Sequence, residues 1–375
     1  MRTVSFVIVA ATVMGCSGHR FESFFSSGDR YLSARRYSEA AIEFQNAARI
    51  NPDSAAVQAR LGDVYAAMNQ TMAAATAYQR ACALNPNDPT PCVEAAANLL
   101  LLGDFDGAIA PARTALAADQ YNLDAQLLLG SALAGVQRFA EAEERLEAAL
   151  ALAPGDARPY RGLGNLQRQR GNMKAAEVWL RNSVERDPSS AETRVDLARV
   201  YMETGRAADG ERELQAAVNA DPQDPEANEA LARRLVAMGR CDDAERYWTQ
   251  LAARSKDGSG ALALADFYVS QNRYDDALRV LQSAHVSGQE AAVEARVASI
   301  TYDHGDRTKA AALVDHVLAR YQSNVDAMLL KARMALDERD VATARDYAHR
   351  AAAIAPDAPA VRNILAAANE AREDR

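Results

Sequence analysis

The sequence predicts an all-α fold, a solenoid of about ten helix-turn-helix repeats with a C-terminal cap helix. Six prolines fall on a lattice of 34 residues: Pro52, Pro86, Pro154, Pro188, Pro222 and Pro356. The first five are separated by 34, 68, 34 and 34 residues, and the last gap of 134 is two short of four periods. That deficit indicates two slightly shortened repeats. Small and apolar residues recur in the same register, which a generic alanine-rich bundle would not maintain.

One period shows the recurring residue types most fully: Leu61-Gly62, Tyr65, Ala74, Tyr78, Ala81 and Pro86. Gly62 and Ala74 are expected where two antiparallel helices cross closely, because a larger side chain would force them apart. Proline then ends the second helix, since it lacks the N–H group that a helix needs. This pattern resembles the tetratricopeptide repeat, and the resemblance implies a right-handed superhelix of helix pairs.

The same landmarks predict ten repeats within residues 21–358. Their expected starts lie near Phe21, Ala55, Pro89, Leu123, Ala157, Ala191, Pro225, Gly258, Ala292 and Val325. Residues 359–375 are expected to form a cap helix, because Val361, Ile364 and Leu365 share one helical face. Since each repeat contacts only its neighbours, we expect one elongated domain.

Composition and charge narrow the function. The chain is 49% hydrophobic and 25% charged, as is ordinary for a soluble helical protein. Its formal net charge is −9, and no run of lysine and arginine is long enough to follow a phosphate backbone. We therefore expect no nucleic-acid partner.

The N-terminus carries a predicted targeting segment. Residues 4–13 are almost entirely apolar, follow one positive charge at Arg2 and precede Gly15-Cys16. A stretch of about ten residues is too short to span a bilayer but suits a secretory signal. Residues 1–15 resemble a bacterial lipoprotein signal peptide. The alternative is an ordinary secretory signal with a chance cysteine.

The lipoprotein resemblance implies removal of residues 1–15 and lipid attachment to Cys16, with residues 16–20 as a short tether. Two or three acyl chains would hold the protein at the membrane almost permanently. In lipoproteins of double-membrane bacteria, a residue such as Ser17 implies transport to the outer membrane. The expected location is the cell envelope, facing the periplasm, with membrane contact through the lipid only.

Two further cysteines are predicted to lie in neighbouring helices. Cys82 falls late in the second helix of repeat two, and Cys92 falls early in the first helix of repeat three. An oxidising periplasm would permit a disulfide, which needs Cα atoms within about 7 Å. The sequence leaves the bond open, and we expect two buried thiols. Cys241 is expected to be a small turn residue.

No catalytic motif is recognisable. The five histidines are scattered, and the chain has no H-E-x-x-H pair, phosphate-binding loop or G-x-S-x-G turn. Gly162-Leu163-Gly164 occupies the Leu-Gly position of its repeat, so helix packing explains it. We expect no enzyme, cofactor or metal. The alternative is a concealed enzyme that recruits residues from several repeats.

The tetratricopeptide resemblance implies a concave groove lined by positions two, five, nine, twelve and thirteen of each first helix. In repeats two to seven, these positions change from apolar to basic. The predicted groove residues are Val93, Leu100, Leu101, Leu127, Arg158, Arg161, Asn165, Arg168, Arg199 and Arg233. We expect a peptide whose apolar part lies in repeats two to four and whose acidic end meets the arginines.

Nearby carboxylates offer an alternative for these arginines. Glu192, Glu203, Glu226 and Glu229 are close enough in sequence pattern to neutralise a solvated basic face. Arg161 and Asn165 also fit two places of the carboxylate clamp that some relatives use to hold chaperone tails. Asp196 departs from that clamp, so a chaperone co-factor role is not expected.

These observations predict a lipid-anchored periplasmic scaffold that binds protein partners in a cell-envelope machine. The layout resembles that of long-array tetratricopeptide lipoproteins of exopolysaccharide and exosortase-type systems, so the machine would serve polysaccharide export, pilus assembly or protein sorting. One alternative is an adaptor that docks peptidoglycan hydrolases. Another is a cytosolic adaptor, which requires the N-terminal segment to be uncleaved. The sequence leaves the oligomeric state open.

Overall fold

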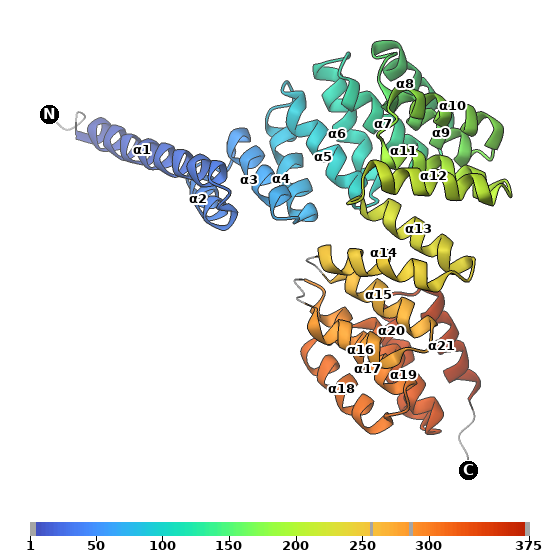
Figure 1. Ribbon diagram of the computed structural model, residues 1–375. Helices are drawn as coiled ribbons and strands as arrows, with labels where there is room; N and C mark the ends of the chain where they lie inside the picture. Colours follow the sequence, from blue (N-terminus) through green and yellow to red (C-terminus); the bar gives the residue numbers. More distant parts are fainter. Residues whose placement is uncertain (1–4, 256–257, 285–287, 372–375) are drawn as a thin grey trace. The chain divides into compact units, whose positions relative to one another are not determined.

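The computed structural model describes residues 5–255, 258–284 and 288–371, with side chains from His19 onward. Every element in these residues is an α-helix (Figure 1). The first helices of the repeats are α1 (Ser5–Ser33), α3 (Ala55–Ala67), α5 (Pro89–Leu101), α7 (Leu123–Gly135), α9 (Ala157–Gln169), α11 (Ala191–Glu203), α13 (Pro225–Ala237), α15 (Ser259–Ser270), α17 (Glu290–Asp303) and α19 (Val325–Asp337). The second helices are α2 (Tyr37–Ile50), α4 (Thr71–Leu84), α6 (Phe105–Ala118), α8 (Phe139–Leu152), α10 (Met173–Arg186), α12 (Ala207–Ala220), α14 (Cys241–Arg254), α16 (Tyr274–Ser283), α18 (Arg307–Arg320) and α20 (Val341–Ile354). The last helix, α21, spans Pro359–Glu370.

The predicted all-α repeat fold is confirmed. Seven of the expected repeat starts are the first residues of first helices, from Ala55 in α3 to Val325 in α19. Two others differ slightly: α15 begins one residue after Gly258, and α17 begins two residues before Ala292. The remaining expected start, Phe21, lies inside α1, which begins at Ser5. The chain divides into an N-terminal unit, Met1–Ala220, and a C-terminal unit, Asp221–Arg375. The sequence pattern does not predict this division.

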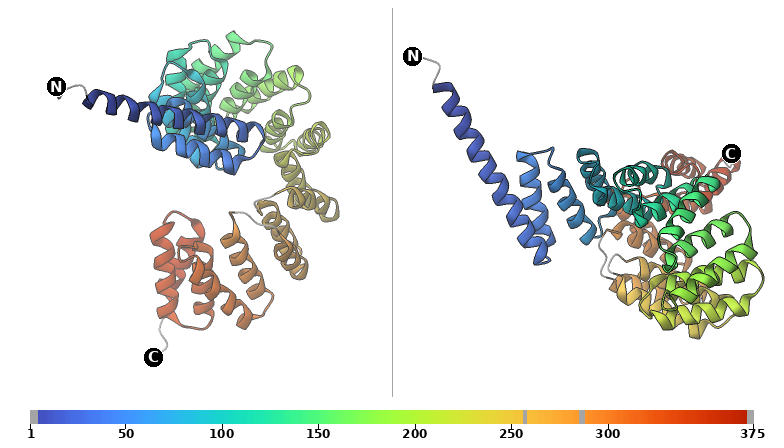
Figure 2. Two further views of the ribbon diagram at one scale, coloured as in Figure 1. Left: turned by 90° about the vertical axis from the view of Figure 1, so that its left-hand side faces the viewer. Right: turned by 90° about the horizontal axis from the view of Figure 1, so that it is seen from above.

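Within each unit, a helix packs mainly against the helices before and after it in the chain (Figure 2). A residue with positive φ turns the chain between the two helices of each repeat: Arg35, Asn69, Gly103, Gln137, Gly171, Gly205, Gly239, Asn272, Gly305 and Arg339. Neighbouring turn residues are 34 apart, except for two steps of 33 from Gly239 to Asn272 and from Asn272 to Gly305. These steps are the two shortened repeats that the proline spacing predicts.

Close helix crossings explain the recurring glycines. A Cβ atom added to Gly62 would lie 2.5 Å from the ring of Tyr78, and one added to Gly164 would lie 2.6 Å from Leu180. Ala74, on the helix that faces Gly62, is fully buried. The predicted role of small residues at the crossing is therefore confirmed, because no larger side chain fits without displacing the Tyr78 or Leu180 side chain.

The first repeat is held by aromatic packing. The ring of Phe25 in α1 lies 5.7 Å from that of Phe44 in α2, measured between centroids, and Phe44 is fully buried. The helix α1 includes Cys16, but the predicted lipidation site and the signal peptide, residues 1–15, lie outside the residues whose side chains are described. Among the described residues, no helix is both long and apolar enough to cross a membrane.

A disulfide joins Cys82 in α4 to Cys92 in α5, with the Cα atoms 4.8 Å apart. The expectation of two separate thiols is wrong. These helices belong to adjacent repeats, and their packing brings the two Cα atoms within the distance that a disulfide spans. Both cysteines are buried beside Ala115 and Ala125. Cys241, the first residue of α14, carries a free thiol and is half-buried.

Candidate functional site

The predicted apolar part of the groove lies on α5 and α7. Val93 packs against the cluster that holds the disulfide, while Leu100 and Leu127 pack against a larger core cluster that contains Leu133. These three side chains are half-buried, whereas Leu101 is 78% exposed. Of the four, Leu101 therefore offers the most surface to a partner. The others support the helices on which a partner would lie.

We call the side of the first helices α3, α5, α7, α9 and α11 on which the predicted groove lies the first-helix face. Carboxylates also occupy part of this face. Asp63 in α3 accepts a hydrogen bond from the Tyr78 hydroxyl (2.9 Å) and forms an ion pair with Arg60 (3.0 Å). Glu94 in α5 keeps an exposed surface, and its pKa lies above its ordinary value because partial burial disfavours its charge and because Asp63 and Asp124 repel it. Glu94 is at position six of α5 and falls outside the positions used for the prediction, whereas Asp63 and Asp124 occupy positions nine and two of their helices but were not among the predicted groove residues.

Arg158 bridges two first helices. Its Nη1 lies 2.7 Å from Asp124 in α7, and its Nη2 lies 2.7 Å from Asp156, which precedes α9. The hydrogen bonds from Arg158 lower the pKa of Asp156 below its ordinary range. Asp156 also caps α9 by accepting a hydrogen bond from the Arg158 backbone N–H (2.8 Å). The Arg158 charge is therefore already matched by two carboxylates.

Three predicted residues meet at one buried carboxylate. Asp196 in α11 accepts hydrogen bonds from Arg161 Nε (2.7 Å), Asn165 Nδ2 (2.8 Å) and Arg199 Nη1 (3.0 Å). Its side chain is 4% exposed. Arg161 also pairs with Glu192 at the more exposed side of the network. The residue that departs from the carboxylate clamp therefore connects α9 to α11.

The remaining predicted arginines are also paired. Arg168 Nη1 lies 3.0 Å from Glu203, but Arg168 Nε is buried and has no hydrogen-bond partner. Arg233 pairs with Glu229 (2.6 Å) within α13 and belongs to the C-terminal unit. Glu192, Glu203 and Glu229 thus act as the neutralising neighbours that the sequence alternative names. An acidic partner would have to exchange with these carboxylates.

The C-terminal unit contains a cavity of about 520 Å³ on three of its first helices and on the last helix. Four helices, α15, α17, α19 and α21, contribute the lining residues Leu262, Arg296, Asp326, Leu329, Arg333 and Ile364. Arg296 pairs with Asp266 (2.7 Å), and Arg333 pairs with Asp303 (2.8 Å). Asp326, Leu329 and Arg333 occupy positions two, five and nine of α19. Extending the positional rule beyond repeat seven would have found them.

Ion pairs dominate the chemistry of this face. Within the described parts of the chain, no three His, Cys, Asp or Glu side chains gather as a metal site. The predicted guanidinium groups all have carboxylate partners, which suits exchange of ion pairs with a bound peptide.

Models of one protein family match most of the chain. Models described as the tetratricopeptide repeat match residues 25–89, 127–191, 229–292 and 298–359, and another of the same description matches residues 167–234. No curated protein matches the chain.

Two solved structures share the fold, and a third is similar to part of the chain. The chain is similar to a tetratricopeptide repeat protein from Parabacteroides merdae, with 15% identity and a TM-score of 0.56 over 66% of this chain and 99% of that one. It is similar to IFIT1 with 16% identity and a TM-score of 0.50, covering 88% and 80% of the two chains. A thermophilic repeat protein from Thermus thermophilus is 24% identical, with a TM-score of 0.45 over 49% of this chain and 100% of that one.

Proposed function

Because the chain belongs to the tetratricopeptide repeat family, we propose that it is a protein–protein interaction scaffold, tethered to a membrane by lipid on Cys16, that serves a cell-envelope machine. The tetratricopeptide repeat fold is typically a non-catalytic scaffold that binds protein partners. The finer assignment of location and machine rests on the N-terminal sequence and on the groove.

The first-helix face of the N-terminal unit carries this proposal. On α9, Arg158, Arg161 and Arg168 stand within one run of paired charges, and α7 packs against both α9 and α5, where Leu101 is exposed. A peptide with an acidic end can replace Glu203 at Arg168, whose Nε still lacks a hydrogen-bond acceptor. Its apolar part would lie toward α5 and α7. This arrangement favours a partner segment of mixed apolar and acidic character.

The disulfide supports an envelope location. Disulfides persist in oxidising compartments such as the bacterial periplasm and are rare in the cytosol. The bond between Cys82 and Cys92 therefore agrees with export of the chain, as the Gly15-Cys16 sequence does. Cys16 lies within α1, five residues before Phe21, the expected start of the first repeat. Lipid on Cys16 would hold the first repeat close to the bilayer.

Affinity capture from native membranes tests the groove. We compare the wild type with the triple variant Arg158→Glu, Arg161→Glu and Arg168→Glu, and with Arg212→Glu as a matched control. Arg212 lies on the second helix α12 and its side chain is 76% exposed. We expect export, pilus or sorting proteins to be lost only in the triple variant. Capture that is unchanged in the triple variant would contradict this site.

Two further readouts separate the parts of the proposal. Arg161→Glu places a carboxylate beside buried Asp196 and could disturb the fold. The double variant Arg158→Glu and Arg168→Glu, which leaves Arg161 in place, is therefore used as bait in a parallel capture. Thermal unfolding of every variant checks that it is folded. Captured wall hydrolases would favour the adaptor alternative. Mass spectrometry of the N-terminus tests the anchor: acylated Cys16 is expected, whereas an intact Met1 in the native host would favour a cytosolic adaptor.

A further inference from the structure

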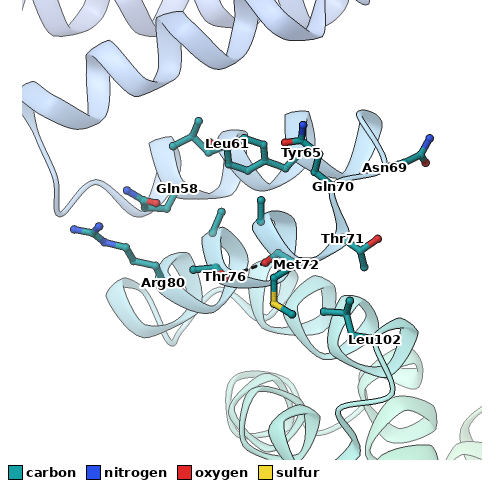
Figure 3. A pocket seen from close by; sticks show the side chains of 12 residues that line it. Gln58, Leu61, Tyr65, Asn69, Gln70, Thr71, Met72, Thr76, Arg80 and Leu102 are labelled. Atoms are coloured by element: carbon teal, nitrogen blue, oxygen red, sulfur yellow. Dashed lines mark hydrogen bonds between the residues drawn. The ribbon is translucent and has the colours of Figure 1, made fainter. Parts of the chain in front are cut away.

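A second surface lies away from the first-helix face. A cavity of about 860 Å³ opens along α3 and α4, with Leu61 and Tyr65 on one side and Met72 and Thr76 on the other (Figure 3). Leu102, just after α5, closes the end near Met72, and Arg80 stands at the opposite end. We call this surface the α3–α4 groove.

The helix α4 is unusual among the second helices in its lack of charge. It carries one charged residue, Arg80, whereas α6 carries two, Asp106 and Arg113, and every other second helix carries at least three. A solvated helix face normally bears more charge than this. The surface that α4 contributes to the groove is therefore suited to being covered.

Met72 is exposed at a position where the other second helices carry no large apolar side chain. Its side chain is 64% exposed. The corresponding second position of other second helices is small, polar or charged, as in Ser38, Asp106, Ala140 and Lys174. Leu102, which lines the same groove, is 38% exposed. Together, Met72 and Leu102 form an apolar patch that the packing of the repeats does not explain.

Arg80 gives the groove a positive end. Its Nη2 donates to the Pro52 carbonyl (2.9 Å), and the contact with the carboxylate of Asp53 is long, at 3.9 Å. The Asp53 side chain is 83% exposed, and that of Arg80 is 51% exposed. The Arg80 charge is therefore less completely matched than those of the paired arginines on the first-helix face. The other polar lining residues, including Gln58 and Gln70, are uncharged.

We propose that the α3–α4 groove docks a short amphipathic helix of a partner protein, whose apolar side chains cover Met72 and Leu102 and whose acidic residue meets Arg80. Met72 and Arg80 are eight residues apart on α4, which corresponds to about 12 Å, or two turns of a partner helix. Helices commonly bind grooves through an apolar face with a charged end. This surface is separate from the first-helix face, so either site can fail without the other.

Two synthetic helical peptides test the groove. Both carry leucine and alanine on one face, and they differ only in one terminal residue, Glu or Lys. Fluorescence anisotropy measures their binding to the full chain. We expect the Glu peptide to bind about threefold to fivefold more tightly, in line with an exposed ion pair. In Arg80→Glu, the preference should reverse, because the charge at the groove end is inverted.

Met72→Glu tests the apolar patch. Burying a charged side chain under the peptide should weaken the binding of both peptides by about tenfold. Val178→Glu is the matched control, because Val178 is 58% exposed on the second helix α10, outside the groove. Thermal melting checks that Met72→Glu is folded. Equal binding of the two peptides with no reversal in Arg80→Glu, or unchanged binding in Met72→Glu, would overturn the proposal.

Other occupants of the groove give different results. Sedimentation velocity tests for a second copy of the chain, and flotation with phosphatidylcholine vesicles tests for a lipid surface. Self-association or vesicle binding that disappears in Met72→Glu, without the charge preference for the Glu peptide, would overturn the assignment of a partner helix. Neither assay involves the arginines of the first-helix face.

Discussion

Arg161 Nε donates a hydrogen bond to Asp196 Oδ2 across 2.7 Å and so joins α9 to α11 in consecutive repeats. Asn165 and Arg199 donate to the same carboxylate. Because the Asp196 side chain is 4% exposed, it depends on these donors for the hydrogen bonds that water would otherwise supply. The first-helix face is therefore held together by a polar network as well as by apolar packing.

Asp196→Ala should lower the free energy of unfolding by about 2 kcal/mol, because three donors lose a shared buried acceptor. Arg161 keeps Glu192, which limits the loss. Urea unfolding of the full chain, followed by circular dichroism, measures the change. Glu192→Ala is the control, since its side chain is 58% exposed and its loss should cost less than about 0.5 kcal/mol. Equal destabilisation by the two variants would show that the network has no special role.

Glu203→Gln should strengthen binding of an acidic partner peptide by about threefold, because it removes the carboxylate that competes for Arg168. The substitution keeps the shape of the side chain. Titration with a synthetic acidic peptide measures the affinity. Glu185→Gln makes the same charge change on the exposed surface of α10 and should have no effect. Weaker binding to Glu203→Gln would mean that the glutamate itself contacts the peptide.

The repeat fold follows from local rules that the sequence displays. Pro52 and its equivalents end second helices because proline cannot continue a helix, and Gly62 permits the crossing that Tyr78 fills. These constraints act within one repeat or between neighbours, so spacing alone reveals them. The positive-φ turn residues Gly239 and Asn272 mark the first 33-residue step.

The candidate site is less predictable because it depends on depth and on pairing between repeats. The positional rule places Val93 and Leu127 on the first-helix face but does not show that both are half-buried. It places both Arg158 and Asp124 at position two of their helices, 34 residues apart, but does not show that the two side chains form an ion pair. The disulfide between Cys82 and Cys92 likewise required the separation of two Cα atoms, which spacing does not give.

Removing the disulfide should destabilise the N-terminal unit. Cys82→Ala with Cys92→Ala should lower the free energy of unfolding by about 3 kcal/mol, the chain-entropy value for a loop of ten residues. Urea unfolding with and without dithiothreitol provides the measurement. The wild type should lose stability on reduction, whereas the double variant should not change. Cys241→Ala is the control, because Cys241 is a free thiol. Equal midpoints for oxidised and reduced wild type would contradict a structural role for the bond.

Glu94 should make stability depend on pH in a defined direction. Its pKa is raised first by partial burial of the carboxylate and then by repulsion from Asp63 and Asp124. A raised carboxyl pKa means that the folded chain holds the proton more tightly than the unfolded chain. The resulting stability is fully present below the ordinary glutamate pKa of about 4.3 and is lost as pH rises through the raised value.

Glu94→Gln removes the charge that opposes folding, so the variant should be more stable than the wild type at pH 7. The difference should shrink toward zero below about pH 4, where the wild-type carboxyl is protonated in both states. Urea midpoints between these pH values give the comparison. Glu147→Gln, on the exposed side of α8, should show no such trend. A wild type that is more stable than Glu94→Gln at pH 7 would instead reveal a favourable cationic neighbour for Glu94.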